Sequence, residues 1–219
     1  MSNKLKLPKP YLSYSAISLW LRDKDAYRAR YYENEPFIST PYTDFGNKVG
    51  KALEIGELFD DTLKKVPRNP VMEKKLVVDI GGVPFLGYLD SFDPINLEVL
   101  EYKTGIISKE GIEPWSRLAV RKHTQLTMYQ LAVFTKYGEY NPDIKLVWME
   151  TRWTKVPETV TLGSRQFTTD VPGLELTGRV EIFDRYIEMW ELERMEKIII
   201  KIAEEISADY KLCKKTNKS

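Results

Sequence analysis

Two short segments of the sequence combine carboxylates with a lysine at a spacing that suits metal-assisted chemistry. The first is Gly87-Tyr88-Leu89-Asp90, and the second, one turn and one strand later, is Glu101-Tyr102-Lys103-Thr104-Gly105. Because alternate side chains of a strand share a face, Glu101 and Lys103 are expected to point the same way. If the neighbouring strand brings Asp90 to that face, two carboxylates and one ammonium group converge there.

This set of groups predicts hydrolysis of a phosphodiester with the help of a divalent metal. Two neighbouring carboxylates repel each other and favour a hard cation, and oxygen ligands of this type suit Mg²⁺ or Mn²⁺. A lysine beside the metal can orient or help to deprotonate the attacking water and can stabilise negative charge in the transition state. From the residues alone, simpler roles stay open: Glu-x-Lys also fits a solvent-facing strand, Asp90 a loop cap, and Lys103 a strand end.

The surrounding pattern predicts the strands that would hold these groups. Apolar residues alternate over 76–80, Gly81-Gly82 makes a turn, and residues 83–89 form the returning strand of a hairpin. A further turn precedes a third strand over 98–103. We therefore expect a three-stranded meander with the two carboxylates on adjacent strands.

Helices are predicted before and after the meander. Apolar residues at helical spacing indicate a basic helix over about 16–32, a second over about 44–63 with Glu54 beside its apolar stripe, and a third over 125–136. The remaining predicted elements are a strand over 145–154, an edge hairpin over 159–170 and a long amphipathic helix over about 178–212. The expected fold class is α/β: a central mixed sheet with a three-stranded meander core, flanked by helices and followed by a long C-terminal helix.

Composition is consistent with one intracellular domain. Of 219 residues, 42% are hydrophobic, and no repeat or Gly/Ser linker divides the chain, so we expect a single domain over 1–219. Its core would span about 10–154, and a C-terminal hairpin and helix about 155–212. The net charge of +1 neither demands nor excludes a polyanionic partner.

Cysteine usage and apolar runs narrow the compartment. Cys213 is the only cysteine, which excludes an intramolecular disulfide, a thiolate zinc site and a cysteine-ligated iron–sulfur cluster. The first ten residues lack the apolar run of a signal peptide, and no stretch approaches the roughly 20 apolar residues of a membrane span. We expect a cytoplasmic protein that makes no use of a membrane.

Asp90 followed by Glu101-x-Lys103 resembles the signature of the PD-(D/E)xK nuclease superfamily, which has a restriction-endonuclease-like fold. The local sequence of both segments is most similar to that of its RecB-like exonuclease branch, which includes CRISPR-associated relatives. Three further segments agree over about 10–153. They are Tyr11-Leu12-Ser13-Tyr14-Ser15 at the start of the basic helix, Phe45-Gly46 to Leu53-Glu54 on the second helix, and Gln125-x-x-x-Tyr129.

Two departures from that branch concern the metal site. RecB-like enzymes place a metal-binding histidine four residues before the position of Glu54, and this chain has Gly50 there, while its one histidine is His123. Glu54 is then expected to be the helix-borne ligand, directly or through water. Relatives with an iron–sulfur cluster use four cysteines, so the chain resembles the cluster-free type.

The resemblance implies a role for each matched residue. Asp90, Glu101 and Lys103 would be catalytic; Asp90, Glu101, Glu54 and the backbone carbonyl of Tyr102 would hold Mg²⁺ or Mn²⁺. The residues expected to position the site and the DNA are Gln125, Tyr129, Tyr14, Arg28 and Arg30. Gln125 and Tyr129 also suit packing, and the last three also suit a solvated face.

The expected function is metal-dependent hydrolysis of DNA to a 5′-phosphate and a 3′-hydroxyl. The resemblance favours exonuclease action on linear or single-stranded DNA. The expected setting is phage or mobile-element replication, recombination or repair. The alternatives are a catalytically weak DNA-binding scaffold and a structure-specific endonuclease. Expected partners are single-stranded DNA or duplex ends, and a protein partner or second copy bound through the C-terminal helix.

Overall fold

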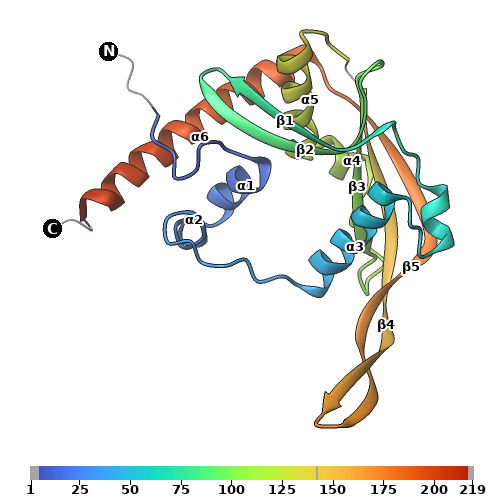
Figure 1. The fold of residues 1–219 in the computed structure, drawn as a ribbon. Coiled ribbons are helices and arrows are strands. Elements are labelled where there is room, and N and C mark those ends of the chain that lie inside the picture. The colour runs from blue at the N-terminus through green and yellow to red at the C-terminus, as the bar shows by residue number, and fades with distance from the viewer. Residues whose placement is uncertain (1–4, 142, 217–219) are drawn as a thin grey trace.

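The protein is built on a mixed five-stranded sheet, as a computed structural model describing residues 5–141 and 143–216 shows (Figure 1). The strands follow chain order across the sheet, with β3 and β4 parallel and every other neighbouring pair antiparallel. They are β1 (Val71–Ile80), β2 (Val83–Asp93), β3 (Glu98–Ile106), β4 (Asp143–Leu162) and β5 (Arg165–Tyr186). The predicted meander corresponds to β1, β2 and β3.

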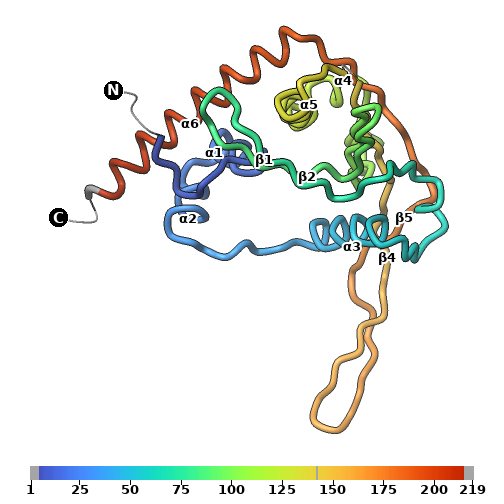
Figure 2. The backbone as a smooth tube through the Cα atoms, turned by 45° about the horizontal axis from the view of Figure 1, so that its top comes forward, coloured from blue at the N-terminus to red at the C-terminus, as the bar shows by residue number. Residues whose placement is uncertain are grey.

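Helices cover both faces of this sheet, which confirms the predicted α/β class. They are α1 (Tyr14–Arg22), α2 (Lys24–Tyr31), α3 (Pro41–Ile55), α4 (Arg117–Arg121), α5 (Thr124–Tyr137), α6 (Met189–Thr216) and the short 3₁₀ helix η1 (Asp61–Lys65). The main core cluster joins α1, α5 and α6 to one face, and a smaller one joins α3 and η1 to the other (Figure 2). None of the described helices is long and apolar enough to cross a membrane.

The two N-terminal helices that the sequence predicted end earlier than expected. The helix predicted over 16–32 is broken at Asp23, whose backbone is extended (φ −156°, ψ 100°) and whose carboxylate caps α2 by accepting from Asp25 N and Ala26 N. A capping side chain favours a new helix start over continuation. The helix predicted over 44–63 stops at Gly56, whose φ of 78° is easily adopted only by glycine.

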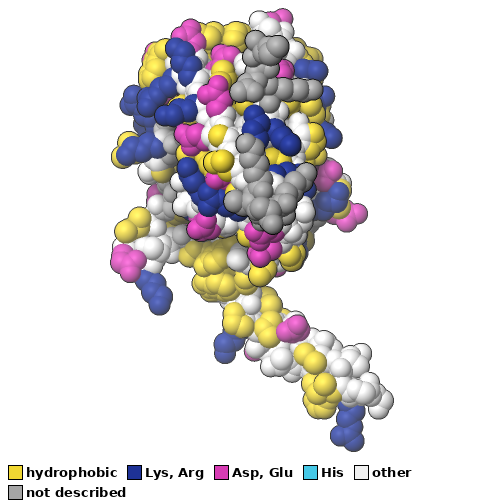
Figure 3. All heavy atoms as spheres, turned by 90° about the vertical axis from the view of Figure 1, so that its left-hand side faces the viewer, with side chains coloured by type: hydrophobic (Ala, Val, Ile, Leu, Met, Phe, Trp, Pro, Cys, Tyr) yellow, Lys and Arg dark blue, Asp and Glu magenta, His cyan; other side chains and the backbone are white. Residues whose placement is uncertain are grey.

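The C-terminal third also differs from the prediction. The strand over 145–154 and the edge hairpin over 159–170 are one continuous hairpin, β4–β5, whose end projects from the body (Figures 1 and 3). The predicted helix start at 178 was wrong, because β5 continues to Tyr186 and α6 begins at Met189. Phe183, which falls inside the range predicted as helix, pairs with Leu146 in the sheet, because apolar residues three to five positions apart do not distinguish a strand end from a helix start.

An ion pair fastens α2 to α6. Arg28 donates from Nη2 to Asp209 Oδ1 (2.6 Å) and from Nε to Asp209 Oδ2 (3.0 Å), and Tyr32 donates to the same carboxylate (3.0 Å). A bidentate arginine–carboxylate ion pair of this kind is stronger than an ordinary surface ion pair. Residues 181 positions apart are thereby joined, so this contact supports the packing of the N-terminal helices.

Replacing Arg28 with alanine should lower the free energy of unfolding by about 2 kcal/mol, the usual contribution of hydrogen bonds to a charged group. The Arg28 hydrogen bond holds the pKa of Asp209 below its ordinary value. The contribution is therefore complete above the unfolded pKa of about 3.9 and is lost as the pH falls through the lower folded pKa. Urea unfolding at pH 7 and pH 3 measures both effects. Arg22→Ala, at an exposed position of α1, is the control; equal losses in the two variants would contradict this role.

Candidate active site

Strands β2 and β3 separate at the predicted site. In the described chain their ladder consists of three residue pairs, of which Ser91–Leu100 is the last. One residue further on, the Asp90 carboxylate accepts the backbone N–H of Tyr102 at 2.7 Å, so a side chain replaces the next backbone acceptor. At the other end of β2, Leu12 bonds to the same edge. The gap between these contacts is where the site forms.

The three residues predicted to be catalytic line one pocket in this gap. Asp90 comes from β2, Glu101 and Lys103 come from β3, and the pocket of about 520 Å³ is completed by residues of α3 and by Gln125 of α5. The Lys103 ammonium donates to Glu101 Oε1 at 2.5 Å. The structure thus brings together the two carboxylates and the lysine.

Burial makes the carboxylates of this pocket costly to ionise. Glu101 is 1% exposed, and burial raises its pKa to about 8, with the Asp90 charge adding to the rise and Lys103 opposing it. Burial also raises the pKa of Asp90, although Lys103 and the Tyr102 N–H oppose that rise. Burial disfavours the Lys103 cation, but Glu101 and Asp90 outweigh it and raise its pKa. A second cation here would relieve the repulsion between the carboxylates.

One oxygen of the pocket has no partner. Glu101 Oε2 is fully buried and accepts no hydrogen bond within the described residues, whereas Oε1 is held by Lys103. The same residues include no group of three or more His, Cys, Asp or Glu side chains arranged to hold a metal. The described residues therefore form no closed protein cage, but Mg²⁺ is usually held by one or two carboxylates, waters and substrate phosphate. The donors present fit that mode of binding.

Helix α3 brings Glu54 and Gly50 to the same pocket. Its approach to the sheet is close at Gly46, where an added Cβ would lie 3.5 Å from Thr104 Oγ1. Glu54 lines the pocket, and its carboxylate pairs with Lys51 at 2.8 Å. An added Cβ at Gly50, one turn earlier, would meet nothing within 4 Å. The space beside Gly50, where the sequence resemblance led us to compare a histidine, is therefore open.

Glu73 also lines the pocket and was not among the residues predicted for the site. Glu73 falls between the ladder pairs Met72–Ser91 and Lys74–Leu89, and its φ of 50° costs energy for a residue with a side chain. The regular alternation of β2 side chains between the two faces of the sheet is broken here. Leu89 and Phe92 are three residues apart and would point to opposite faces in a regular strand, yet both belong to the main core. Burial raises the pKa of Glu73, and Asp90 adds to the rise. In sequence, Glu73 looks like any strand charge beside Lys74.

The predicted pair Gln125 and Tyr129 lies on α5, at the boundary of the pocket. Gln125 Nε2 donates to the Tyr129 hydroxyl at 3.1 Å, and both residues are buried. The Tyr129 ring lies against Gly87, where an added Cβ would be only 3.2 Å from Tyr129 Cε1. Gly87, the first residue of the Asp90 segment, therefore leaves room for the ring of Tyr129.

The remaining predicted residues lie in different surroundings. Tyr14 makes an edge contact with the ring of His123 (5.9 Å between centroids), and burial lowers the pKa of His123 to about 4. Arg28 is held by Asp209 and Asp25. The Arg30 guanidinium lies over the Phe37 ring at 5.1 Å. None of these three predicted residues lines the catalytic pocket, and Tyr14 lines a neighbouring cavity that shares Gln125 with it.

The fold of this chain resembles that of a solved structure. The fold is similar to the crystal structure of a candidate exonuclease from Eubacterium rectale, with a TM-score of 0.55 and 11% identity, over 90% of this chain and 82% of that chain. The crystal structure of SSO0001 gives a TM-score of 0.40 and 13% identity over 89% and 75% of the two chains, which is too weak for an argument. No protein-family model and no curated protein matches the sequence. The first likeness supports a nuclease-like fold and concerns the fold alone.

Proposed function

We propose that this protein is a Mg²⁺- or Mn²⁺-dependent deoxyribonuclease that acts as an exonuclease. The observation that carries the proposal is the buried Glu101, whose Oε2 has no hydrogen-bond partner among the described residues and which lines one pocket with Asp90 and Lys103. A nuclease-like fold agrees with it. A carboxylate that only stabilised the fold would be expected to have both oxygens satisfied, because burying an unpaired polar atom is unfavourable.

Each residue of the pocket has a task in this proposal. Asp90, Glu101 and the Tyr102 carbonyl would hold the cation, with Glu54 contributing directly or through water. The cation would polarise the phosphate and lower the pKa of a bound water. Lys103, fixed by Glu101 Oε1, would orient the attacking water and stabilise charge on the phosphate oxygens. Gln125 and Tyr129, joined by their hydrogen bond, would position the strand that is cut.

A catalytically weak DNA-binding scaffold is the second candidate. It is favoured by Gly50, which leaves open the space where RecB-like enzymes have a metal-binding histidine, and by the ion pair that already engages Glu54. In that case α6 would serve to bind a protein partner or a second copy. The two candidates differ in whether the Asp90 carboxylate affects the fate of bound DNA.

Hydrolysis of matched linear and closed circular single strands tests the proposal. In Mn²⁺ or Mg²⁺, wild-type protein should degrade the linear strand to products with 5′-phosphates and spare the circle. Asp90→Ala and Lys103→Ala should leave both intact. Cutting of the circle, which has no free end, would show that the protein is an endonuclease and not an exonuclease. If wild type and variants are equally inert while DNA binding persists, the scaffold is correct and the enzyme proposal fails.

A further inference from the structure

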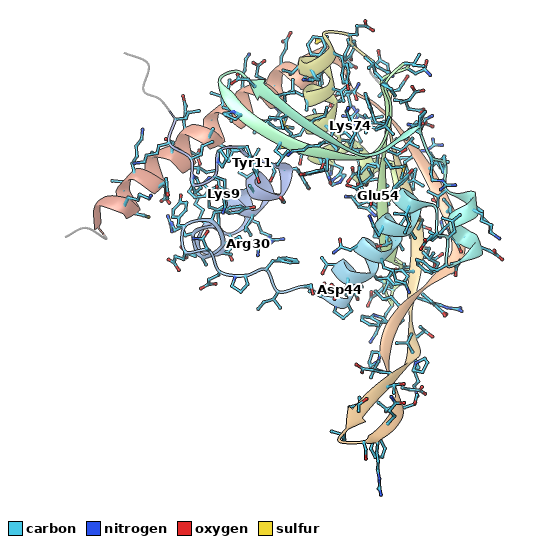
Figure 4. The ribbon with its side chains drawn as sticks, in the orientation of Figure 1. Lys9, Tyr11, Arg30, Asp44, Glu54 and Lys74 are labelled. Carbon is cyan, nitrogen blue, oxygen red and sulfur yellow. The ribbon has the colours of Figure 1, made fainter. Side chains whose placement is uncertain are left out.

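A second cavity adjoins the proposed catalytic pocket and is lined largely by tyrosines. It has a volume of about 340 Å³ and lies between the N-terminal segment with α1 and α2 on one side and β2 with α5 on the other. Gln125 lines both cavities, so the two are neighbours. Its aromatic residues are Tyr11, Tyr14, Tyr27, Tyr31, Tyr88 and Tyr129. Figure 4 shows Tyr11 and Lys9 on the N-terminal segment, across from Glu54 on α3.

The tyrosines of this cavity are of two kinds. Tyr27 is 1% exposed and packs against Trp20, and Tyr129 is held by Gln125, so these rings form fixed walls. Tyr11 is 37% exposed and Tyr88 is 46% exposed. Parts of both exposed rings are therefore accessible to a ligand from solvent.

The two cavities differ in charge. Four carboxylates line the catalytic pocket: Glu54, Glu73, Asp90 and Glu101. None lines the tyrosine cavity, where Lys9 is the charged residue and Ser13 and Ser15 add hydroxyls. Aromatic faces with a cation at the rim suit a flat base attached to a phosphate.

We propose that the tyrosine cavity binds an unpaired base of single-stranded DNA next to the phosphate that is cut. This inference rests on the function proposed above and defines its substrate as a single-stranded end. Gln125, which lines both cavities, and Tyr129, to which Gln125 donates, would separate the stacked base from the scissile phosphate. A base inside a duplex is already stacked and paired, so it cannot enter without leaving the helix. A volume near 340 Å³ is at the lower end of ligand pockets and suits one nucleotide.

Binding measurements without hydrolysis test this inference. A labelled single strand and its blunt duplex are titrated with protein in EDTA, and affinity is read from fluorescence anisotropy. Wild type should prefer the single strand. Tyr11→Ala and Tyr88→Ala should each weaken single-strand binding by roughly 5- to 100-fold, the range for loss of one stacked base. Tyr11→Phe and Tyr88→Phe should bind as wild type does, because the ring remains.

Tyr186→Ala is the matched control, since Tyr186 is 58% exposed and lies on β5 outside the cavity. The inference is overturned if the alanine variants bind single strands as tightly as wild type, or if Tyr186→Ala weakens binding equally. A strand carrying 2-aminopurine should also lose fluorescence on binding to wild type and less on binding to the alanine variants. The binding assay contains EDTA and so does not depend on hydrolysis. If binding requires the tyrosine rings but the protein does not cleave DNA when Mn²⁺ is supplied, only the nuclease function is rejected. Cleavage that is indifferent to both rings would reject only the cavity's role.

Discussion

Lys103→Met should reduce DNA hydrolysis by a factor on the order of 100 to 1,000, the usual loss when one stabilising group is removed from a developing charge. Methionine keeps the length of the side chain and removes the ammonium that Glu101 Oε1 fixes in the pocket. Single-turnover rates at saturating Mn²⁺ isolate the chemical step from DNA binding. Thermal unfolding of the variant confirms that the folded state is retained.

Lys145→Met is the matched control for this substitution. Lys145 pairs with Glu98 across neighbouring strands, as Lys103 pairs with Glu101 along one strand, but Lys145 lies outside the catalytic pocket. Its loss should leave the rate within about twofold of wild type. A Lys103→Met protein that is folded and fully active would show that the ammonium takes no part in the reaction.

Gly50→His should raise the affinity for Mn²⁺ by roughly tenfold, or about 1.4 kcal/mol, with a smaller gain for Mg²⁺ because imidazole is a softer ligand than a carboxylate. An added Cβ at Gly50 meets nothing within 4 Å, and Gly50 lines the pocket with Asp90 and Glu101. An imidazole placed there has room to supply a nitrogen ligand. Isothermal titration calorimetry with each metal measures the change.

Gly50→Ala separates the ligand effect from the helix effect. Gly50 lies within α3, where glycine is less favourable than alanine by about 1 kcal/mol, so both variants should unfold at higher temperature. Only the histidine variant should bind metal more tightly. Equal metal affinity in wild type and Gly50→His would show that α3 does not face the bound cation, and that Glu54 is too remote to act as a ligand.

The sequence was sufficient for the meander because its turns and periodicity are local. The Gly81-Gly82 turn and the alternation around it predict β1 and β2, and the structure bears this out. The period of two predicted that Glu101 and Lys103 share a face, whereas the approach of Asp90 depended on the neighbouring strand and stayed conditional until the structure placed all three in one pocket. Their roles in catalysis and the identity of the metal stay predictions.

Features that depend on competing interactions were not predictable in the same way. Asp23 could continue a helix or cap the next one, and only its bonds to Asp25 and Ala26 decide between them. The positive φ of Glu73 occurs where the side chains of the β1–β2 hairpin stop alternating regularly between the two faces of the sheet. No residue type near Glu73 in the sequence indicates this irregularity. Arg28 looked like part of a basic DNA-binding face, but its partner Asp209 lies far along the chain.

The location of Mn²⁺ in crystals of the wild-type protein tests the central claim most directly. Anomalous density at the manganese edge should lie in the catalytic pocket, in contact with the Asp90 and Glu101 carboxylates, and should disappear in Asp90→Asn. Glu101 Oε2, which accepts no hydrogen bond from the described residues, should be among the ligands. No density in the pocket at a Mn²⁺ concentration that saturates DNA cleavage, or density only elsewhere, would contradict the proposed metal centre.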